Sequence, residues 1–201
     1  SLRSKSSLGK KRDDHYSIYT MGAVGCYLSH YKVWEMMIKR NYKRIIVFED
    51  DVILSNNYCK KLVEIFDKSI NKIILNTCDM ISLGYITVSG GKKINEDLSK
   101  LNGNLIGTQN YILNRDGCLR LIRNAFPIEV QVDAYIGYMS RKMNSYYLNN
   151  KISSFSFSYG TDIQTTCIKC YLPNNNLFYY ILIFIVVMLI ILYFYQTKST
   201  Y

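Results

Sequence analysis

The sequence predicts an α/β domain followed by one transmembrane helix. Short apolar runs rich in β-formers alternate with helical stripes, and one such run ends abruptly in three acidic residues. A long uncharged segment lies near the C-terminus. With 201 residues, of which 49% are hydrophobic, the chain is long enough for a core and is not of the disordered class.

Residues 28–40 show the first helical pattern. Their apolar positions recur every three or four residues and form one stripe, made of Leu28, Tyr31, Trp34, Met37 and Ile38. Residues 45–48 are Ile-Ile-Val-Phe, a short and wholly apolar run. Such a run is typical of a central strand covered on both faces. It is followed at once by Glu49, Asp50 and Asp51.

The rest of the domain continues the alternation. Asn56 and Asn57 offer an N-cap to a helix that reaches residue 68, and Pro127 stops a later helix. Further helices are predicted over residues 115–125 and 133–143, strands over 79–84, 105–113, 146–148 and 152–157, and a turn at 90–91.

The acidic triplet is the first candidate site. Three carboxylates at a strand end repel one another and raise their own pKa values, and a bound divalent cation would relieve that repulsion. Hard oxygen ligands suit magnesium or manganese, and ligands of open α/β sheets collect at the carboxyl ends of strands. A solvated acidic turn is the alternative interpretation.

The formal net charge of +10 favours anionic partners such as phosphate-bearing donors. Binding to nucleic acid is not expected, because the basic residues are dispersed apart from residues 10–12 and no reading motif is present. A metal-dependent nuclease or phosphatase would want further ligands, and the chain has only two histidines. Cys167 and Cys170 form one CxxC pair, which alone is weak evidence for a zinc or redox site. Neutral juxtamembrane cysteines that can be acylated are the favoured interpretation.

Residues 177–195 predict a transmembrane helix, because they contain no charge and about 19 helical residues span roughly 28 Å. Residues 196–201 then form a short tail and residues 165–176 a juxtamembrane linker, while residues 1–21 are expected to be a flexible basic arm. Basic residues before the span predict a membrane protein with a C-terminal anchor and a cytosolic domain.

Residues 22–34 and 46–52 together resemble glycosyltransferase family 25, the lipopolysaccharide-biosynthesis and procollagen-galactosyltransferase group. The first block reads Gly-x-x-Gly-Cys-x-x-Ser-His-x-x-x-Trp, and the second contains Glu-Asp-Asp at a strand end. Weaker similarities follow at residues 107–113, at Pro127 with residues 132–133, and at residues 160–164. The resemblance covers residues 22–164, which are taken as the glycosyltransferase-like domain.

This resemblance implies a GT-A-like nucleotide-sugar transferase fold. It also implies metal-dependent, inverting transfer of a hexose, galactose or glucose, from a nucleotide-diphosphate sugar to a hydroxyl on glycan, lipid or protein. Asp51 and Glu49 are then the expected ligands of manganese or magnesium. Asp133 is the expected catalytic base, with a second metal contact as an equal possibility.

The donor-binding residues implied by the resemblance are Ser29, His30, Glu49, Asp50 and Thr108. Ser29 and His30 would begin a helix whose free N–H groups suit a phosphate. His30 is otherwise a packing histidine, Trp34 belongs to the core, and Tyr111 either shapes the pocket or is structural.

One departure from the family pattern matters. Members open with a strand carrying Asn-Leu-Asp-x-x-x-x-Arg, and only 21 mostly polar residues precede Gly22 here. We therefore expect either a fragment or a reduced homologue that lacks the first strand. The alternative to an active enzyme is a degenerate, membrane-anchored homologue that acts as a binding or scaffold protein.

Overall fold

The computed structural model describes residues 20–155, which form a mixed α/β domain. Six strands make one sheet in the order β1-β6-β3-β7-β5-β4, and β2 pairs with β8 in a separate two-stranded sheet. Within the large sheet β3 and β7 are parallel, and the other neighbours are antiparallel. In chain order the elements are α1 (Met21–Lys39), β1 (Arg44–Phe48), β2 (Val52–Leu54), α2 (Tyr58–Phe66), α3 (Ser69–Thr77), β3 (Met80–Gly84), β4 (Thr87–Lys93), β5 (Leu98–Ile106), β6 (Asn110–Asn114), α4 (Arg115–Arg123), α5 (Val132–Ser140), β7 (Ser145–Leu148) and β8 (Ser153–Phe155).

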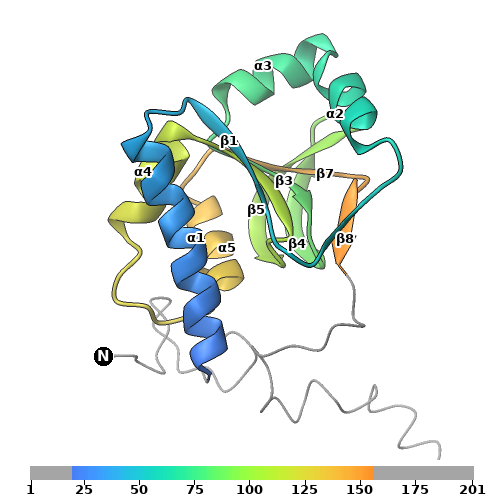
Figure 1. Ribbon diagram of the computed structural model, residues 1–201. Coiled ribbons are helices and arrows are strands. Elements are labelled where there is room, and N and C mark those ends of the chain that lie inside the picture. The colour runs from blue at the N-terminus through green and yellow to red at the C-terminus, as the bar shows by residue number, and fades with distance from the viewer. Residues whose placement is uncertain (1–19, 156–201) are drawn as a thin grey trace, which may run out of the picture. The chain divides into compact units, whose positions relative to one another are not determined.

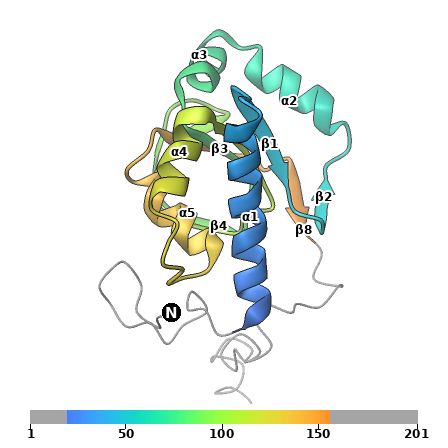
Figure 2. The same ribbon diagram turned by 60° about the vertical axis from the view of Figure 1, so that its left-hand side comes forward.

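The domain has three layers. Helices α1, α4 and α5 lie on one face of the sheet and α2 and α3 lie on the other (Figure 1; Figure 2). Successive side chains of β6 point to opposite faces of the sheet and so contribute to both cores. Tyr111 and Leu113 pack under α1 and α4, while Ile112 packs toward α2 and α3. The mixed α/β class predicted from the sequence is therefore confirmed.

Strand β1 lies at one end of the large sheet, not at its centre. Among the described residues it pairs only with β6, and its side chains Ile46 and Phe48 are 40% and 45% exposed. The prediction of a central strand covered on both faces is wrong in this respect. Val47 supplies the buried side of the strand, whereas α2 and α3 leave the opposite side of β1 largely uncovered.

Two predicted boundaries also differ from the structure. Gly90 and Gly91 do not make a turn between elements; they lie inside β4, at a β-bulge opposite β5. Residues 105–113 are not one strand, because β5 ends at Ile106 and β6 begins at Asn110. Between them Gly107 has a φ of +87°, a conformation that favours glycine and turns the chain.

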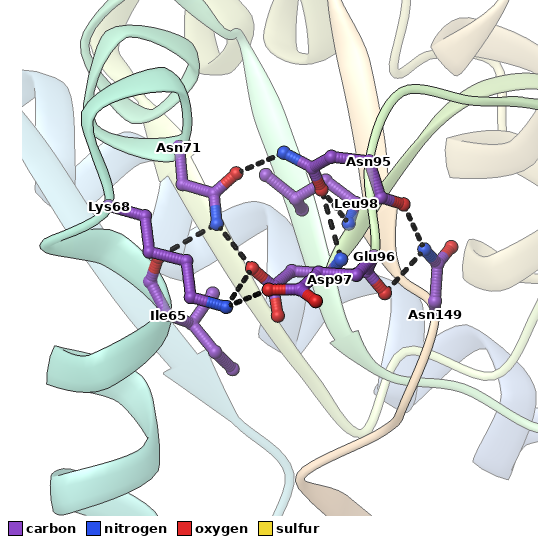
Figure 3. A network of polar contacts seen from close by, with 8 residues as sticks. All are labelled: Ile65, Lys68, Asn71, Asn95, Glu96, Asp97, Leu98 and Asn149. Atoms are coloured by element: carbon purple, nitrogen blue, oxygen red, sulfur yellow. Dashed lines mark hydrogen bonds and ion pairs between the residues drawn. The ribbon is translucent and has the colours of Figure 1, made fainter.

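A polar network ties α3 to the loop before β5 (Figure 3). Asp97 Oδ2 accepts hydrogen bonds from Lys68 Nζ at 2.8 Å and from Asn71 Nδ2 at 2.7 Å. Asn95 donates to Asn71, and Asn149 donates to the backbone carbonyls of Asn95 and Glu96. Asn71 is completely buried, so these bonds satisfy an amide that would otherwise be costly to bury.

The predicted membrane anchor requires a correction. Residues 177–195 lie outside the described residues, and within residues 20–155 the structure contains no helix that is both long and apolar enough to cross a bilayer. The fold is therefore a mixed α/β domain built on a six-stranded sheet, without support for a C-terminal transmembrane helix. The predicted membrane localisation of the chain loses its support with it.

Candidate functional site

Helix α1 begins earlier than the sequence pattern predicts. Thr20 is its N-cap, and the Thr20 hydroxyl accepts a hydrogen bond from Ala23 N at 3.1 Å. Ser29 and His30 therefore lie in the middle of a 19-residue helix and do not begin it. Their backbone N–H groups belong to the helix interior, so the expected phosphate-binding helix start at these two residues is wrong.

Helix α1 contributes two pairs of residues near Glu49, one pair on its inner side and one on its exposed side. Cys26 and His30 are one turn apart on the inner side, where His30 is buried. Gly25 and Ser29 are one turn apart on the exposed side, and Ser29 Oγ donates to Gly25 O at 2.9 Å. A Cβ at Gly25 would have no neighbour within 4 Å.

Glu49 is placed by non-local strand pairing. Its backbone N donates to Gln109 O at 3.0 Å, which continues the β1–β6 pairing one residue beyond Phe48 and Asn110. This pairing sets Glu49 beside Thr108. The Thr108 hydroxyl donates to Glu49 Oε1, and Thr108 itself is 3% exposed.

His30 reaches the same carboxylate from α1. His30 Nε2 lies 3.2 Å from Glu49 Oε1, and His30 Nδ1 lies 2.8 Å from Tyr111 Oη. Trp34 Nε1 donates to Tyr111 Oη at 3.1 Å. The two blocks of the sequence that were first singled out, residues 22–34 and 46–52, thus meet through one hydrogen-bonded chain.

Asp133 joins the site through the turn after β5. Its Oδ2 accepts from Gly107 N at 3.2 Å, and its Oδ1 accepts from Ala134 N in the first turn of α5. Gly107 and Thr108 are neighbours in sequence, so a single turn holds both Asp133 and Glu49 in place. A carboxylate at a helix N-terminus is also favoured by the helix dipole.

The electrostatics show how the acids gather around Cys26. Burial and, to a smaller extent, the negative charges of Glu49, Asp133, Asp50 and Asp51 together raise the pKa of the Cys26 thiol from 9.0 to about 12. All four carboxylates therefore lie close enough to Cys26 to act on its thiol. Sequence reasoning did not single out Cys26, although its position four residues before His30 was a helical-spacing signal.

The acidic triplet does not converge as a set of three. Within residues 20–155 one group of Cys, His, Asp or Glu residues has ligand atoms within 4.8 Å of one another, and it consists of Cys26, His30 and Glu49. Asp50 and Asp51 are exposed beside it. Burial raises the pKa of Asp51, as do Glu49 and Asp50, while a backbone hydrogen bond opposes the shift.

Two surface hollows lie away from these residues. One of about 840 Å³ lies beside the C-terminal half of α1 and is lined by Lys32, Lys39 and Arg40 among others. A smaller one of about 230 Å³ lies between Tyr27 and Pro127. Neither contains a cluster of acids, so the chemistry-bearing residues remain those around Glu49.

Comparison with known proteins shows which family the chain resembles. Residues 3–136 match the family described as glycosyltransferase family 25 (LPS biosynthesis protein). The mouse protein named inactive glycosyltransferase 25 family member 3 is 42% identical over 84 residues, which are 40% of this chain and 14% of the relative. A Drosophila melanogaster glycosyltransferase 25 family member is 28% identical over 133 residues, 62% of this chain and 21% of the relative.

Human procollagen galactosyltransferase 2 is 29% identical over 147 residues, which cover 68% of this chain and 23% of the human protein. The chain thus spans between 14% and 23% of the length of these three relatives. The family match covers more than half of the chain, and it includes all of the residues that meet at Glu49 and Asp133. The chain belongs to glycosyltransferase family 25.

Proposed function

We propose that this chain carries the donor-binding part of a glycosyltransferase that moves a hexose from a nucleotide-diphosphate sugar to a hydroxyl acceptor, with inversion at the sugar. The observation that supports this proposal best is the convergence of four distant segments. His30 and Thr108 both hold Glu49, and Gly107, next to Thr108, holds Asp133. Family membership makes sugar transfer the leading chemistry for such a cluster of acids.

A divalent cation, manganese or magnesium, suits Asp51 and Glu49. Burial and then the like charge of Glu49 raise the pKa of Asp51, and a bound cation would offset both effects. One oxygen of Glu49 accepts two hydrogen bonds, and the other carries none from the described residues. Carboxylate oxygens are the ligands that both cations prefer. When bound, the cation would neutralise the charge of the leaving diphosphate.

Asp133 is the proposed general base. It would take the proton from the acceptor hydroxyl as that oxygen bonds to the anomeric carbon and the nucleoside diphosphate departs with the electrons of the broken bond. Two backbone N–H groups hold its carboxylate at a fixed orientation, which suits this task. A second contact to the cation is the alternative role for the same side chain.

The exposed side of α1 is the proposed binding surface for the donor. Gly25 leaves the helix backbone bare beside Cys26, so a ligand can approach it closely. The hydroxyl of Ser29 and the carboxylate of Asp50 are both exposed at this place and could contact the donor.

Release of nucleoside diphosphate tests the proposal directly. The full chain is incubated with UDP-galactose or UDP-glucose, with manganese or magnesium, and with hydroxyl acceptors. A collagen-type peptide is the first acceptor to try, because one relative is named procollagen galactosyltransferase 2. Asp133→Asn should lower turnover by about 10²–10⁴-fold, the usual contribution of a general base. Asp67→Asn, an exposed acid after α2, is the matched control and should leave turnover unchanged.

A second candidate function has an observation of its own. Four relatives with identities of 38–42% are named inactive or probable inactive family members. A degenerate homologue that binds a sugar nucleotide or a glycan without turning it over would explain that similarity. Donor binding without release of nucleoside diphosphate, in wild-type protein and in Asp133→Asn alike, would select this alternative.

A further inference from the structure

We propose that the side-chain carboxamide of Gln109 recognises the transferred sugar by hydrogen bonding to two of its hydroxyl groups. This inference rests on the proposed function, because it names a further residue that contacts the donor at the same site. The supporting observation is a buried polar group without a partner. Gln109 is 3% exposed, and its Oε1 atom has no hydrogen bond.

An unpaired amide of this kind is uncommon inside a protein. The great majority of buried polar groups are hydrogen-bonded, and an unsatisfied one destabilises the fold. The backbone carbonyl of Gln109 accepts from Glu49 N at 3.0 Å, whereas the side chain has no hydrogen bond to the described residues. An apolar side chain would suit this position better if packing were its only task. The carboxamide is therefore best explained by a ligand that it binds.

Gln109 lies at the edge of the sheet where ligands are expected. Strands β1 and β3 both run antiparallel to β6, so their carboxyl ends lie at the edge where β6 begins. Gln109 directly precedes β6, which lies between β1 and β3 in the sheet. In open α/β sheets, ligands bind in the crevice outside the carboxyl ends of the strands. The place of Gln109 in the fold is thus a binding position.

The two acids of the proposed reaction flank this residue. Glu49 pairs with the backbone of Gln109, and Asp133 accepts from the backbone N of Gly107, two residues earlier in the chain. The proposed cation at Glu49 takes the diphosphate of the donor, and the acceptor hydroxyl lies at Asp133. The sugar between the diphosphate and that hydroxyl then lies beside Gln109.

A carboxamide has the hydrogen-bonding groups that a pair of sugar hydroxyls needs. Its oxygen accepts from one hydroxyl, and its NH₂ group donates to the other. The carboxamide is folded against the turn, because a Cβ built on Gly107 would lie 2.6 Å from Gln109 Nε2 and 2.8 Å from Gln109 Oε1. Rotation about the side-chain bonds of Gln109 turns the carboxamide from this glycine toward the sugar. That rotation breaks no hydrogen bond to the described residues, so the sugar supplies a partner that the protein does not.

Calorimetric titration of the full chain with two kinds of ligand tests the inference. With manganese present, UDP-galactose or UDP-glucose is compared with UDP on wild-type protein and on Gln109→Met, which has similar length and no hydrogen-bonding carboxamide. The variant should bind the sugar nucleotide about tenfold more weakly or worse, the usual worth of two neutral hydrogen bonds. Its affinity for UDP should be unchanged. If Gln109→Met shows no cooperative unfolding transition, Gln109→Leu takes its place.

Ser145→Ala is the matched control. The hydroxyl of Ser145 is also buried and without a partner, but Ser145 begins β7 beside Met80, which begins β3. These strand starts lie at the edge of the sheet opposite to Gln109. Removal of this hydroxyl should leave the affinity for both ligands unchanged. Selective weakening of sugar-nucleotide binding in Ser145→Ala as well would overturn the inference, because the effect would then belong to any unpaired buried group.

The outcomes distinguish this inference from the proposed function. If wild-type protein and Gln109→Met bind the sugar nucleotide equally, or if the variant loses as much affinity for UDP as for the sugar nucleotide, the inference is wrong and the proposed function stands. If wild-type protein binds neither UDP-galactose nor UDP-glucose, the proposed function fails, and sugar recognition by Gln109 fails with it.

Discussion

Tyr111→Phe should destabilise the fold far more than the loss of an average hydroxyl. The substitution leaves the buried Trp34 N–H without an acceptor and the buried His30 Nδ1 without its hydrogen-bond partner. Each unsatisfied buried group costs about 1–3 kcal/mol, so the sum, after some local relaxation, is about 2–4 kcal/mol.

Two further tyrosines calibrate the measurement. Tyr85 donates one hydrogen bond, to Leu148 O at 2.8 Å, so Tyr85→Phe should cost about 0.5–1.5 kcal/mol. Tyr138 has no hydrogen bond from its hydroxyl to the described residues, and its replacement should stay within about 0.5 kcal/mol. The series therefore grades the stability loss by the number of partners.

Urea unfolding followed by fluorescence measures all three variants. Trp34 is the only tryptophan in the chain, so the signal reports on the affected core. With an m-value of about 1–3 kcal/mol/M, a loss of 3 kcal/mol moves the midpoint by roughly 1–3 M at constant m. A Tyr111→Phe midpoint no lower than that of Tyr138→Phe would refute the claim that this hydroxyl satisfies two buried groups.

Three other predictions follow from the glycines and from Cys26. Gly137→Ala should destabilise the protein by about 1–3 kcal/mol in thermal unfolding, because the added Cβ would lie 2.9 Å from Leu105 N and push α5, which carries Asp133, away from β5. An unchanged melting temperature would contradict this packing. Gly25→Ala should instead stabilise the protein by about 0.5–1 kcal/mol in the same assay, because residue 25 is helical and a Cβ there meets no neighbour. The same substitution should weaken donor binding, and unchanged binding would contradict the proposed donor-binding surface on α1. As pH rises from 9.0 toward about 12, Cys26 should stay a thiol in the folded protein and become a thiolate only near the upper value. Iodoacetamide should therefore modify the exposed Cys59 before the partly buried Cys26, as mass spectrometry of digests would show, and equal rates in folded protein would contradict the raised pKa of Cys26.

Local patterns predicted the elements that carry the site. The apolar run 45–48, the acids after it and the stripe on residues 28–40 all correspond to real features, β1, its carboxyl end and α1. The start of α1 was missed because Gly22 and Gly25 suggest a loop, whereas the Thr20 cap overrides their low helix propensity.

Non-local pairing explains what the sequence could not predict. The contact of Glu49 with Thr108 depends on the register of β1 against β6, and local patterns contain no information on that register. The edge position of β1 has the same origin, because a wholly apolar run does not reveal how many neighbours the strand has. The sequence predicts a core role for Trp34 and either a pocket or a structural role for Tyr111. The polar atoms of both side chains became informative only once His30 was placed between Tyr111 and Glu49.

Titration of the full chain with a sugar nucleotide, in the presence and absence of manganese, tests the central claim most directly. Calorimetry should show binding of UDP-galactose or UDP-glucose that depends on the cation. Asp51→Asn should weaken that binding at least tenfold, and Asp67→Asn should not change it. Absence of binding by a protein with a cooperative unfolding transition, or equal binding by Asp51→Asn, would contradict a cation-dependent donor site at the end of β1.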